Sequence, residues 1–341
     1  MSREFKVVLV APYPYPDPLK RILEDIAEVK VNPLQQQELE EEMKKGDYDV
    51  LICWEFSQRI TRDMIYSANP KLKIIATLSV GYDHIDVRAA KERGIKVINA
   101  AVGNICASAY SVAEFAFWLL LSSVRKTRRV FDIFERDSHS WSEFSQGIVL
   151  GEELFGKTLG IIGMGRIGSH VARIGRGFSM RVIGYDPYVN PERVLADGVI
   201  LVNSLEELLS SSHVISINCY LSDETKRMIG KREISLMRNG VYIVNTARGE
   251  IVDEDAILEG LQSDKIAGYA ADVLTGEPPT EKTSPLLAAY RRRELSNLLL
   301  TPHIAWMSKE AVTKRYPVIV GKKIKAALLR KTLEEWELLK E

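Results

Sequence analysis

The sequence predicts an α/β protein built from two doubly wound parallel-sheet domains. The chain has 341 residues, which is enough for two domains that each bury a core. Runs rich in Val and Ile alternate with helical patterns before residue 105, and a second series of the same kind begins at Lys157. Strands that are each followed by a helix favour a parallel sheet with helices on both faces.

The first series of alternating segments occupies residues 5–100. Strands are expected where short runs rich in Val and Ile occur, at 5–12, 48–54, 72–79 and 96–100. Helices are expected where apolar residues recur at helical spacing, at 19–29, 60–68 and 87–94. Gly94 ends the last of these helices.

The second series begins at Lys157 and gives the second domain its sheet. Strands are expected at 157–163, 180–186, 213–219, 240–247, 265–273 and 297–302. The helices between them include 204–212 and 253–262, and long helices near residues 105–150 are expected to join the two domains. A last helix runs from residue 309 to the end of the chain, with a kink or break at Pro317.

The composition is that of an ordinary globular protein, and it excludes several classes of function. Apolar residues make up 46%, and 46 Lys and Arg balance 46 Asp and Glu, so no net charge attracts nucleic acid or acidic membranes. We therefore expect neither as a partner. The apolar run at 115–121 is too short to span a bilayer and is expected to form a buried helix.

The cysteines and the N-terminal segment indicate a cytoplasmic protein. Cys53, Cys106 and Cys219 form an odd, sparse set, which argues against a disulfide framework and for a reducing compartment. Cys and His residues lack the spacing of metal ligands, so no metal site is expected. The charges within the first six residues are not those of a signal peptide.

A glycine-rich motif, GMGRIG at 163–168, predicts a dinucleotide site because it follows a strand and opens a helix. Gly163 permits the tight turn, Gly165 lets the backbone approach a pyrophosphate, and Gly168 allows close packing of helix on strand. The helix N-terminus then presents N–H groups to the anion. Asp186 ends the next strand and can accept hydrogen bonds from ribose hydroxyls. No Arg follows it at once, so NAD is favoured over NADP.

Three further segments follow predicted strands and carry Arg248, Glu277 and His303. In an open parallel sheet the ligand crevice lies beyond the carboxyl ends of the strands, so these side chains can converge there. Arg can bind a carboxylate or polarise a carbonyl, and His can exchange a proton with an alcohol oxygen near neutral pH. Glu beside His would orient the ring, and NAD would carry the hydride. This set suits reversible reduction of a 2-keto acid to a 2-hydroxy acid.

Several segments together resemble the D-isomer-specific 2-hydroxyacid dehydrogenase family. They cover most of the chain in the family's order: SVGYDHID (79–86), SVAE (111–114), GKTLGIIGMGRIG (156–168), YDP (185–187), NTARGEIVDEDAILEGL (245–261), AADVLTGEP (270–278) and TPHIAW (301–306). The resemblance implies that a Rossmann nucleotide domain is inserted into a flavodoxin-like substrate domain. The NAD-binding domain would span 106–305, and the substrate domain would combine 1–105 with 306–341.

The resemblance also implies a role for each matching residue. Arg248 would bind the substrate carboxylate and keto oxygen, His303 would be the acid/base, and Glu277 would be its partner. Val80 and Gly81 would contact the substrate or the nicotinamide. Besides the three glycines of the motif, the cofactor-contacting positions would be Arg166, Ile167, Asp186, Asn218, Thr246, Ala247, Asp272 and His303. A homodimer is implied, with the helix at 111–124 near its interface.

Trp54 and four of the matching segments bear on the choice of substrate. SVGYDHID and TPHIAW resemble glyoxylate/hydroxypyruvate reductases, whereas GKTLGIIGMGRIG and YDP equally resemble phosphoglycerate dehydrogenases. In the latter, an Arg often helps to hold the substrate phosphate where this chain has Trp54, although Arg59 and Arg62 lie close in sequence. Glyoxylate or hydroxypyruvate is therefore favoured. Phosphohydroxypyruvate and an apolar 2-keto acid remain alternatives, as does a corepressor-like protein that binds NAD and acts through a partner.

Overall fold

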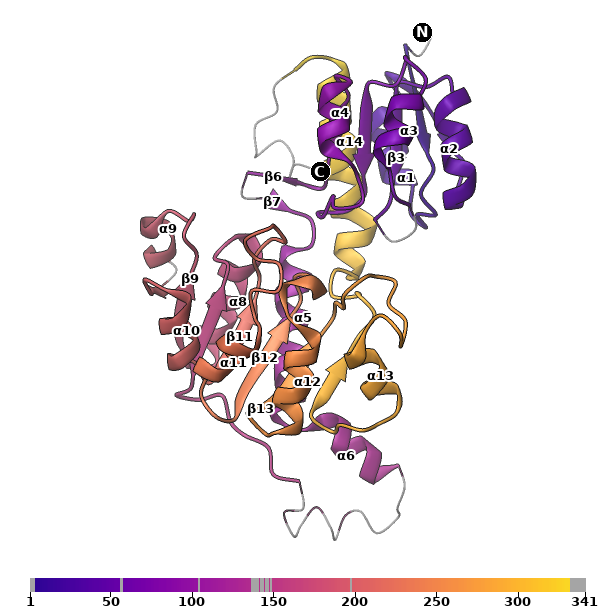
Figure 1. Ribbon diagram of the computed structural model, residues 1–341. Helices are drawn as coiled ribbons and strands as arrows, with labels where there is room; N and C mark the ends of the chain where they lie inside the picture. The colour runs from indigo at the N-terminus through magenta and orange to yellow at the C-terminus, as the bar shows by residue number, and fades with distance from the viewer. Residues whose placement is uncertain are drawn as a thin grey trace. The chain divides into compact units, whose positions relative to one another are not determined.

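The computed structural model describes residues 4–331 except 56–57, 104, 136–140, 142–143, 145–146, 148 and 197. The chain forms two compact units, drawn in Figure 1. Unit 1 combines Met1–Ser108 with Met307–Glu341, and unit 2 is Ala109–Trp306. The boundaries expected from sequence were 105/106 and 305/306. The first division falls later because helix α5 begins at Ala109 and belongs entirely to unit 2.

Unit 1 contains a five-stranded sheet with the order β2-β1-β3-β4-β5, in which every neighbouring pair is parallel. This is the flavodoxin-like order. The strands are Phe5–Leu9, Ala27–Val31, Val50–Cys53, Ile74–Thr77 and Lys96–Ile98 in chain order. The helices of the unit are α1 (Asp17–Leu23), α2 (Gln36–Lys45), α3 (Arg62–Ser67), α4 (Val87–Glu92) and α14 (Tyr316–Leu328). A short antiparallel pair, β6 (Ala101–Val102) and β7 (Ile105–Cys106), follows the sheet.

Two predictions for unit 1 need correction. The helix expected at 19–29 ends at Leu23, and β2 begins at Ala27. In β2 the exposure of the side chains alternates, with Ala27 buried and Glu28 and Lys30 exposed, which is the pattern of a strand and not of a continuing helix. Helix α2 was not predicted either, because only Leu39 and Met43 of its residues are buried and the apolar pattern is weak.

Pro317 does interrupt the last helical segment. A π-helical stretch, η2 (Ala311–Arg315), comes directly before α14, and Pro317 lies in the first turn of α14. Proline has no N–H to donate, so the regular helical hydrogen-bond pattern changes at this point. The part of the predicted helix beyond residue 331 lies outside the described residues.

Unit 2 contains a seven-stranded parallel sheet with the order β10-β9-β8-β11-β12-β13-β14. The strand order reverses next to β8, as in a Rossmann fold, so the predicted fold class is confirmed for both units. In chain order the strands are Thr158–Ile162, Arg181–Tyr185, Ile200–Leu201, Val214–Ile217, Val241–Asn245, Ile266–Ala271 and Leu298–Leu300. The short edge strand β10 was not predicted.

Helices cover both faces of the unit 2 sheet and give it two apolar cores (Figure 1). Along β8 the side chains alternate, so that Leu159 and Ile161 enter one core and Ile162 enters the other. The first core includes α5 (Ala109–Val124) and α8 (Arg166–Gly177). The second includes α10 (Leu205–Ser211), α11 (Lys231–Leu236), α12 (Glu254–Gln262) and α13 (Pro285–Arg291). This double burial explains why the central strands are almost wholly apolar.

Helix α5 contains the apolar run that the sequence analysis singled out. Its buried face, including Phe117 and Leu120, packs against α8 within unit 2. Its other face leaves Tyr110 and Trp118 about half exposed. Within the described part of the chain, helices that combine enough length with enough apolar character to cross a bilayer are not found.

Candidate active site and nucleotide pocket

The glycine motif forms a turn between β8 and α8 whose shape depends on two close approaches. Gly163 has a positive φ of 91°, and a Cβ there would lie 2.6 Å from the backbone nitrogen of Cys219. A Cβ on Gly168 would lie 2.1 Å from the Gly163 carbonyl oxygen. Only glycine permits both contacts. They hold α8 against the strand, so the first N–H groups of α8 point beyond the carboxyl end of the sheet.

A cavity of about 880 Å³ lies at this turn, within the size range of a cofactor pocket. Four residues predicted to bind the cofactor line it: Gly163, Gly165, Asp186 and Asn218. The Asp186 carboxylate accepts hydrogen bonds from the backbone N–H groups of Met164 and Tyr188, each at 2.9 Å. The carboxylate is therefore fixed in place before any ligand arrives.

The other predicted cofactor residues are not on the wall of this cavity. Arg166 lies next to it, because its Nη1 is 3.4 Å from the hydroxyl of Tyr220, a lining residue. Ile167 packs against the core beside α8, and Gly168 supports the turn. The remaining residues lie at the ends of later strands: Thr246, Ala247, Asp272 and His303. Lining residues that the sequence analysis missed follow β9 and β11, and they include Tyr188, Arg193, Cys219, Tyr220, Glu224 and Met228.

Two buried polar atoms fit a nicotinamide dinucleotide. Asn218 Oδ1 and Thr246 Oγ1 are buried and have no hydrogen-bond partner among the described residues. The Asn218 amide nitrogen donates to the carbonyl and hydroxyl oxygens of Ser216, which fixes the orientation of the side chain. Unsatisfied buried polar atoms cost stability, so they favour a ligand that supplies partners. The ribose hydroxyls and carboxamide of NAD offer such groups.

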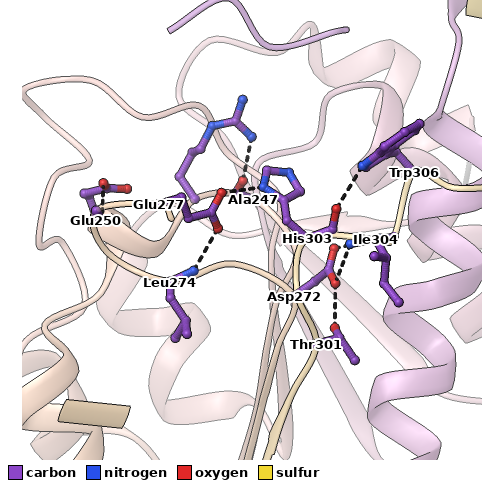
Figure 2. Close-up of polar contacts among 12 residues, drawn as sticks. Ala247, Glu250, Asp272, Leu274, Glu277, Thr301, His303, Ile304 and Trp306 are labelled. Atoms are coloured by element: carbon purple, nitrogen blue, oxygen red, sulfur yellow. Dashed lines mark hydrogen bonds and ion pairs between the residues drawn. The ribbon is translucent and has the colours of Figure 1, made fainter. Parts of the chain in front are cut away.

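The Glu277–His303 pair forms the centre of the candidate active site (Figure 2). Glu277 Oε2 lies 2.5 Å from His303 Nδ1, and the two side chains are 31% and 17% exposed. The other carboxylate oxygen of Glu277 accepts a hydrogen bond from the Leu274 N–H at 3.0 Å. A carboxylate held in this way orients the imidazole ring and leaves Nε2 as the nitrogen that would exchange a proton with a substrate.

The backbone of His303 is held on both sides. It has a positive φ of 56°, its N–H donates to the Asp272 carbonyl at 2.7 Å, and its own carbonyl accepts from Trp306 Nε1 at 2.8 Å. The buried Asp272 carboxylate accepts hydrogen bonds from the Thr301 hydroxyl and the Ile304 N–H (Figure 2). It also accepts one from the Ala305 N–H. Burial raises the pKa of Asp272, against these hydrogen bonds. Asp272 therefore fixes the loop that carries His303, and its contact with the cofactor stays a prediction.

Two acidic residues that the sequence analysis missed anchor the turn that carries Glu277. The buried carboxylate of Glu254 accepts from the Thr275 N–H at 2.8 Å and from the Ser284 hydroxyl at 2.5 Å. Glu250 accepts from the Gly276 N–H at 3.0 Å. Both lie just after Arg248 in sequence, so one segment supplies the predicted substrate-binding cation and the anchors of the Glu277 turn.

Arg248, Glu277 and His303 follow three adjacent strands, β12, β13 and β14, at their carboxyl ends. Adjacent parallel strands end at one edge of the sheet, so the fold assigns all three residues to the same edge. Arg248 Nη1 donates to the carbonyl of Ala247 at 2.9 Å. The arrangement supplies a fixed acid/base pair and a guanidinium suited to a carboxylate.

The remaining predicted substrate contacts belong to unit 1. Trp54 directly follows β3, and its ring meets the edge of Tyr13 with centroids 5.8 Å apart. Val80 and Gly81 come shortly after β4. The Val80 carbonyl accepts from the Asn99 amide at 2.8 Å, and the Gly81 carbonyl accepts from the Ser79 hydroxyl at 2.7 Å. The loop is thus well fixed, and the roles of these residues toward a substrate stay predictions.

Replacing Gly165 by alanine is expected to weaken NADH binding about tenfold or more with a loss of stability of at most about 1 kcal/mol. A Cβ here meets nothing within 4 Å and φ is −73°, so alanine fits without a clash, and only the preference of the α8 N-cap for glycine is lost. The methyl group would stand where the pyrophosphate approaches. Thermal unfolding and fluorescence titration with NADH measure both quantities. Gly177→Ala, which also meets nothing within 4 Å at the far end of α8, is the control. Equal NADH affinity of the two variants would contradict the assignment.

The Cys219 thiol is expected to react slowly with iodoacetamide near neutral pH and more slowly still with NADH present. Burial raises its pKa to about 11, so the reactive thiolate is scarce at neutral pH. Below about pH 11 the alkylation rate should rise about tenfold per pH unit. NADH should protect the thiol because Cys219 lines the cavity. Mass spectrometry of the Cys219 peptide measures the rate. A rate that levels off near the ordinary thiol pKa of about 8.5 would contradict the burial.

Comparisons with known proteins point to a single family for the domain that carries the nucleotide cavity and the Glu277–His303 pair. Residues 117–305 match the family model described as D-isomer specific 2-hydroxyacid dehydrogenase, NAD binding domain. The D-3-phosphoglycerate dehydrogenase of Methanocaldococcus jannaschii is 40% identical over 309 residues, which cover 90% of this chain and 55% of that relative. The hydroxypyruvate reductase of Thermotoga maritima is 39% identical over 267 residues, covering 78% of this chain and 80% of that relative.

A solved structure shares the fold over nearly the whole chain. The glyoxylate reductase from Paecilomyes thermophila has a TM-score of 0.82 and 29% identity, with 98% of each chain covered. The archaeal phosphoglycerate dehydrogenases are longer proteins: this chain spans about half the length of each. The matched domain assigns NAD binding to unit 2, where the cavity and the glycine turn lie.

Proposed function

We propose that this chain, which belongs to the D-isomer specific 2-hydroxyacid dehydrogenase family, is an NAD(H)-dependent oxidoreductase that interconverts a small 2-keto acid and its D-2-hydroxy acid. The observation that carries the proposal is the Glu277–His303 pair, with 2.5 Å between Oε2 and Nδ1. It lies at the carboxyl edge of a sheet that also carries Arg248 and the nucleotide cavity. An acid/base group, an anion-binding group and a hydride carrier are what this reaction requires.

Each of the three side chains then has one task. Bound NADH supplies the hydride that goes to the keto carbon. His303 donates the Nε2 proton to the keto oxygen, and Glu277 stabilises the positive charge that the ring carries beforehand. Arg248 binds the substrate carboxylate through its forked guanidinium and polarises the keto oxygen. In the reverse direction His303 takes the proton from the hydroxyl.

Glyoxylate or hydroxypyruvate is the proposed substrate. The similarity to a hydroxypyruvate reductase and a glyoxylate reductase supports this choice. Trp54 cannot supply a charge for a phosphate, and the guanidinium of Arg62 is already paired with Glu92 at 2.6 Å. Phosphohydroxypyruvate remains the second candidate because phosphoglycerate dehydrogenases are 36–40% identical to this chain.

We further propose that the protein prefers NAD to NADP and forms a cytoplasmic homodimer. The carboxylate of Asp186 at the cavity wall would repel a 2′-phosphate. Exposed aromatic side chains on consecutive helices support a self-association surface; they are Trp118 on α5 and Phe131 and Phe134 on α6 (Thr127–Phe134). The three cysteines are free thiols, which favours a reducing compartment.

NADH oxidation against a panel of 2-keto acids tests the proposed function. The panel contains glyoxylate, hydroxypyruvate, phosphohydroxypyruvate, pyruvate and bulkier 2-keto acids. We expect kcat/KM above about 10⁴ M⁻¹s⁻¹ for glyoxylate or hydroxypyruvate. A clear preference for phosphohydroxypyruvate would replace the substrate assignment. Intact NADH binding with no turnover across the panel would favour a corepressor-like protein instead.

A further inference from the structure

A lysine on the last helix holds the chain where it leaves the sheet of unit 1. Helix α14 packs against α1 and beside β4 and β5. The ammonium of Lys323 on this helix donates to the carbonyl oxygens of Asn99 and Ala101, each at 2.7 Å. It also donates to Oδ1 of the Asn99 side chain at 3.3 Å. Asn99 directly follows β5, so the lysine binds three oxygens at the carboxyl edge of the sheet.

Lys323 decides which way the side-chain amide of Asn99 faces. An ammonium group can only donate hydrogen bonds, so it selects the amide oxygen and turns the amide nitrogen away from itself. That nitrogen donates to the Val80 carbonyl at 2.8 Å. Exchanging the oxygen and nitrogen of the amide would set two donors against each other and two acceptors against each other. The hydrogen bond from Asn99 to Val80 therefore depends on Lys323.

The bonds to Ser79 and Val80 set the direction of the next two N–H groups. In a trans peptide the carbonyl of one residue and the N–H of the next point in opposite directions. The Ser79 carbonyl accepts from the Ala100 N–H at 2.8 Å, and the Val80 carbonyl accepts from Asn99. The N–H groups of Val80 and Gly81 therefore both point away from the segment after β5. Among the residues that the structure describes, neither of these N–H groups has an acceptor.

Two successive N–H groups with fixed directions can bind an anion. The loop is also held from its other side, because the Ser79 hydroxyl donates to the Gly81 carbonyl at 2.7 Å and lies 2.7 Å from the Thr77 hydroxyl. Donors that are fixed beforehand lose little freedom when a ligand binds. A carboxylate has about four acceptor sites, so it can bind these N–H groups together with Arg248.

We propose that Lys323 and Asn99 are positioning residues for the 2-keto acid. Lys323 orients Asn99, and Asn99 fixes the N–H groups of Val80 and Gly81 that bind the substrate carboxylate. The inference rests on the proposed function, in which Val80 and Gly81 contact the substrate. It makes that contact depend on a helix 224 positions further along the chain than Asn99.

Replacing Asn99 by aspartate separates positioning from a merely structural role. The carboxylate keeps an acceptor for Lys323 but has no hydrogen to donate to Val80. We expect N99D to raise the KM of the preferred 2-keto acid about tenfold or more, because a bond to a charged group is weakened. The kcat should change by less than about threefold, and the Kd of NADH should stay within about twofold. Steady-state kinetics and fluorescence titration measure these quantities.

Replacing Lys323 by methionine tests the other half of the proposal. We expect K323M to raise KM about tenfold and to speed hydrogen exchange of the Ala100 amide about tenfold, because the segment after β5 is released. K323R keeps the donors, so its KM should stay within about threefold of the parent. K325M is the matched control, since it removes the same charge from α14 by breaking the surface ion pair of Lys325 with Asp25. It should leave KM and the exchange rate unchanged.

Two results would overturn the proposal. One is an N99D protein whose KM stays within about twofold of the parent, and the other is equal exchange of the Ala100 amide in K323M and K325M. A fall in kcat at unchanged KM would also contradict a role in substrate binding. Failure of the proposed function would look different, because the parent would then reduce no 2-keto acid. Exchange of the Ala100 amide needs no substrate and would still show whether Lys323 holds the loop.

Discussion

Replacing His303 by alanine is expected to lower kcat by at least about 10²-fold and to leave the Kd of NADH within about twofold. The variant removes the group that exchanges the substrate proton. It leaves the cavity wall intact, because His303 is not among the residues that line the cavity. Stopped-flow kinetics with a saturating 2-keto acid and fluorescence titration with NADH measure the two quantities separately.

The control for this substitution is His170→Ala, which removes an imidazole on α8 that stacks near Tyr110. We expect its kcat to stay within about twofold of the parent, since no reacting group is lost. If His303→Ala kept kcat within about threefold of the parent, proton exchange would have to be assigned to another group.

Replacing Gly249 by alanine is expected to reduce the free energy of unfolding by about 1–3 kcal/mol and kcat/KM by about 10²-fold. A Cβ on Gly249 would lie 2.0 Å from the carbonyl carbon of Leu274 and 2.3 Å from the backbone nitrogen of Thr275. Both are backbone atoms and cannot rotate away. The turn would have to move, and with it the Leu274 N–H that holds Glu277.

Denaturant unfolding and steady-state kinetics measure the two effects of Gly249→Ala. Gly230→Ala is the matched control, because its nearest neighbour would be the Glu233 carboxylate at an ordinary 3.5 Å. A Gly249→Ala protein with normal stability and normal kcat/KM would show that the Glu277 turn does not depend on this contact. Normal kcat/KM despite lost stability would show that the position of the Glu277 turn does not affect catalysis.

Local patterns predicted the parts of the fold that depend on short stretches of sequence. The glycine motif and the apolar runs marked β8, α8 and most of the other strands, because each of those signals lies within a few residues. The segment at 19–31 was misread because Ile26, Ala27 and Val29 fit either a helix or a strand at that length. Residues 27–31 form a strand because they pair with β1, and the short local pattern does not contain that contact.

In the candidate site, too, some features depend on short stretches of sequence and others on long-range contacts. Arg248, Glu277 and His303 could be predicted because each follows a strand at the ligand edge of a parallel sheet. The bonds that fix them could not, since Glu254 meets Ser284 and Asp272 meets Ala305 only once the loops have folded. The hydrogen bond from the Tyr188 hydroxyl to Glu224 likewise joins two separate loops, after β9 and after β11. Sequence patterns therefore predicted where the candidate residues lie, whereas the contacts that support them required the structure.

The configuration of the product distinguishes a D-specific dehydrogenase from the alternatives. Purified protein would be incubated with hydroxypyruvate and NADH, and the glycerate formed would be analysed by chiral chromatography. We expect D-glycerate with one NADH oxidised for each molecule formed, and loss of the product with His303→Ala. L-glycerate, a racemic product, or product formation that survives His303→Ala would contradict a D-specific dehydrogenase acting through this site.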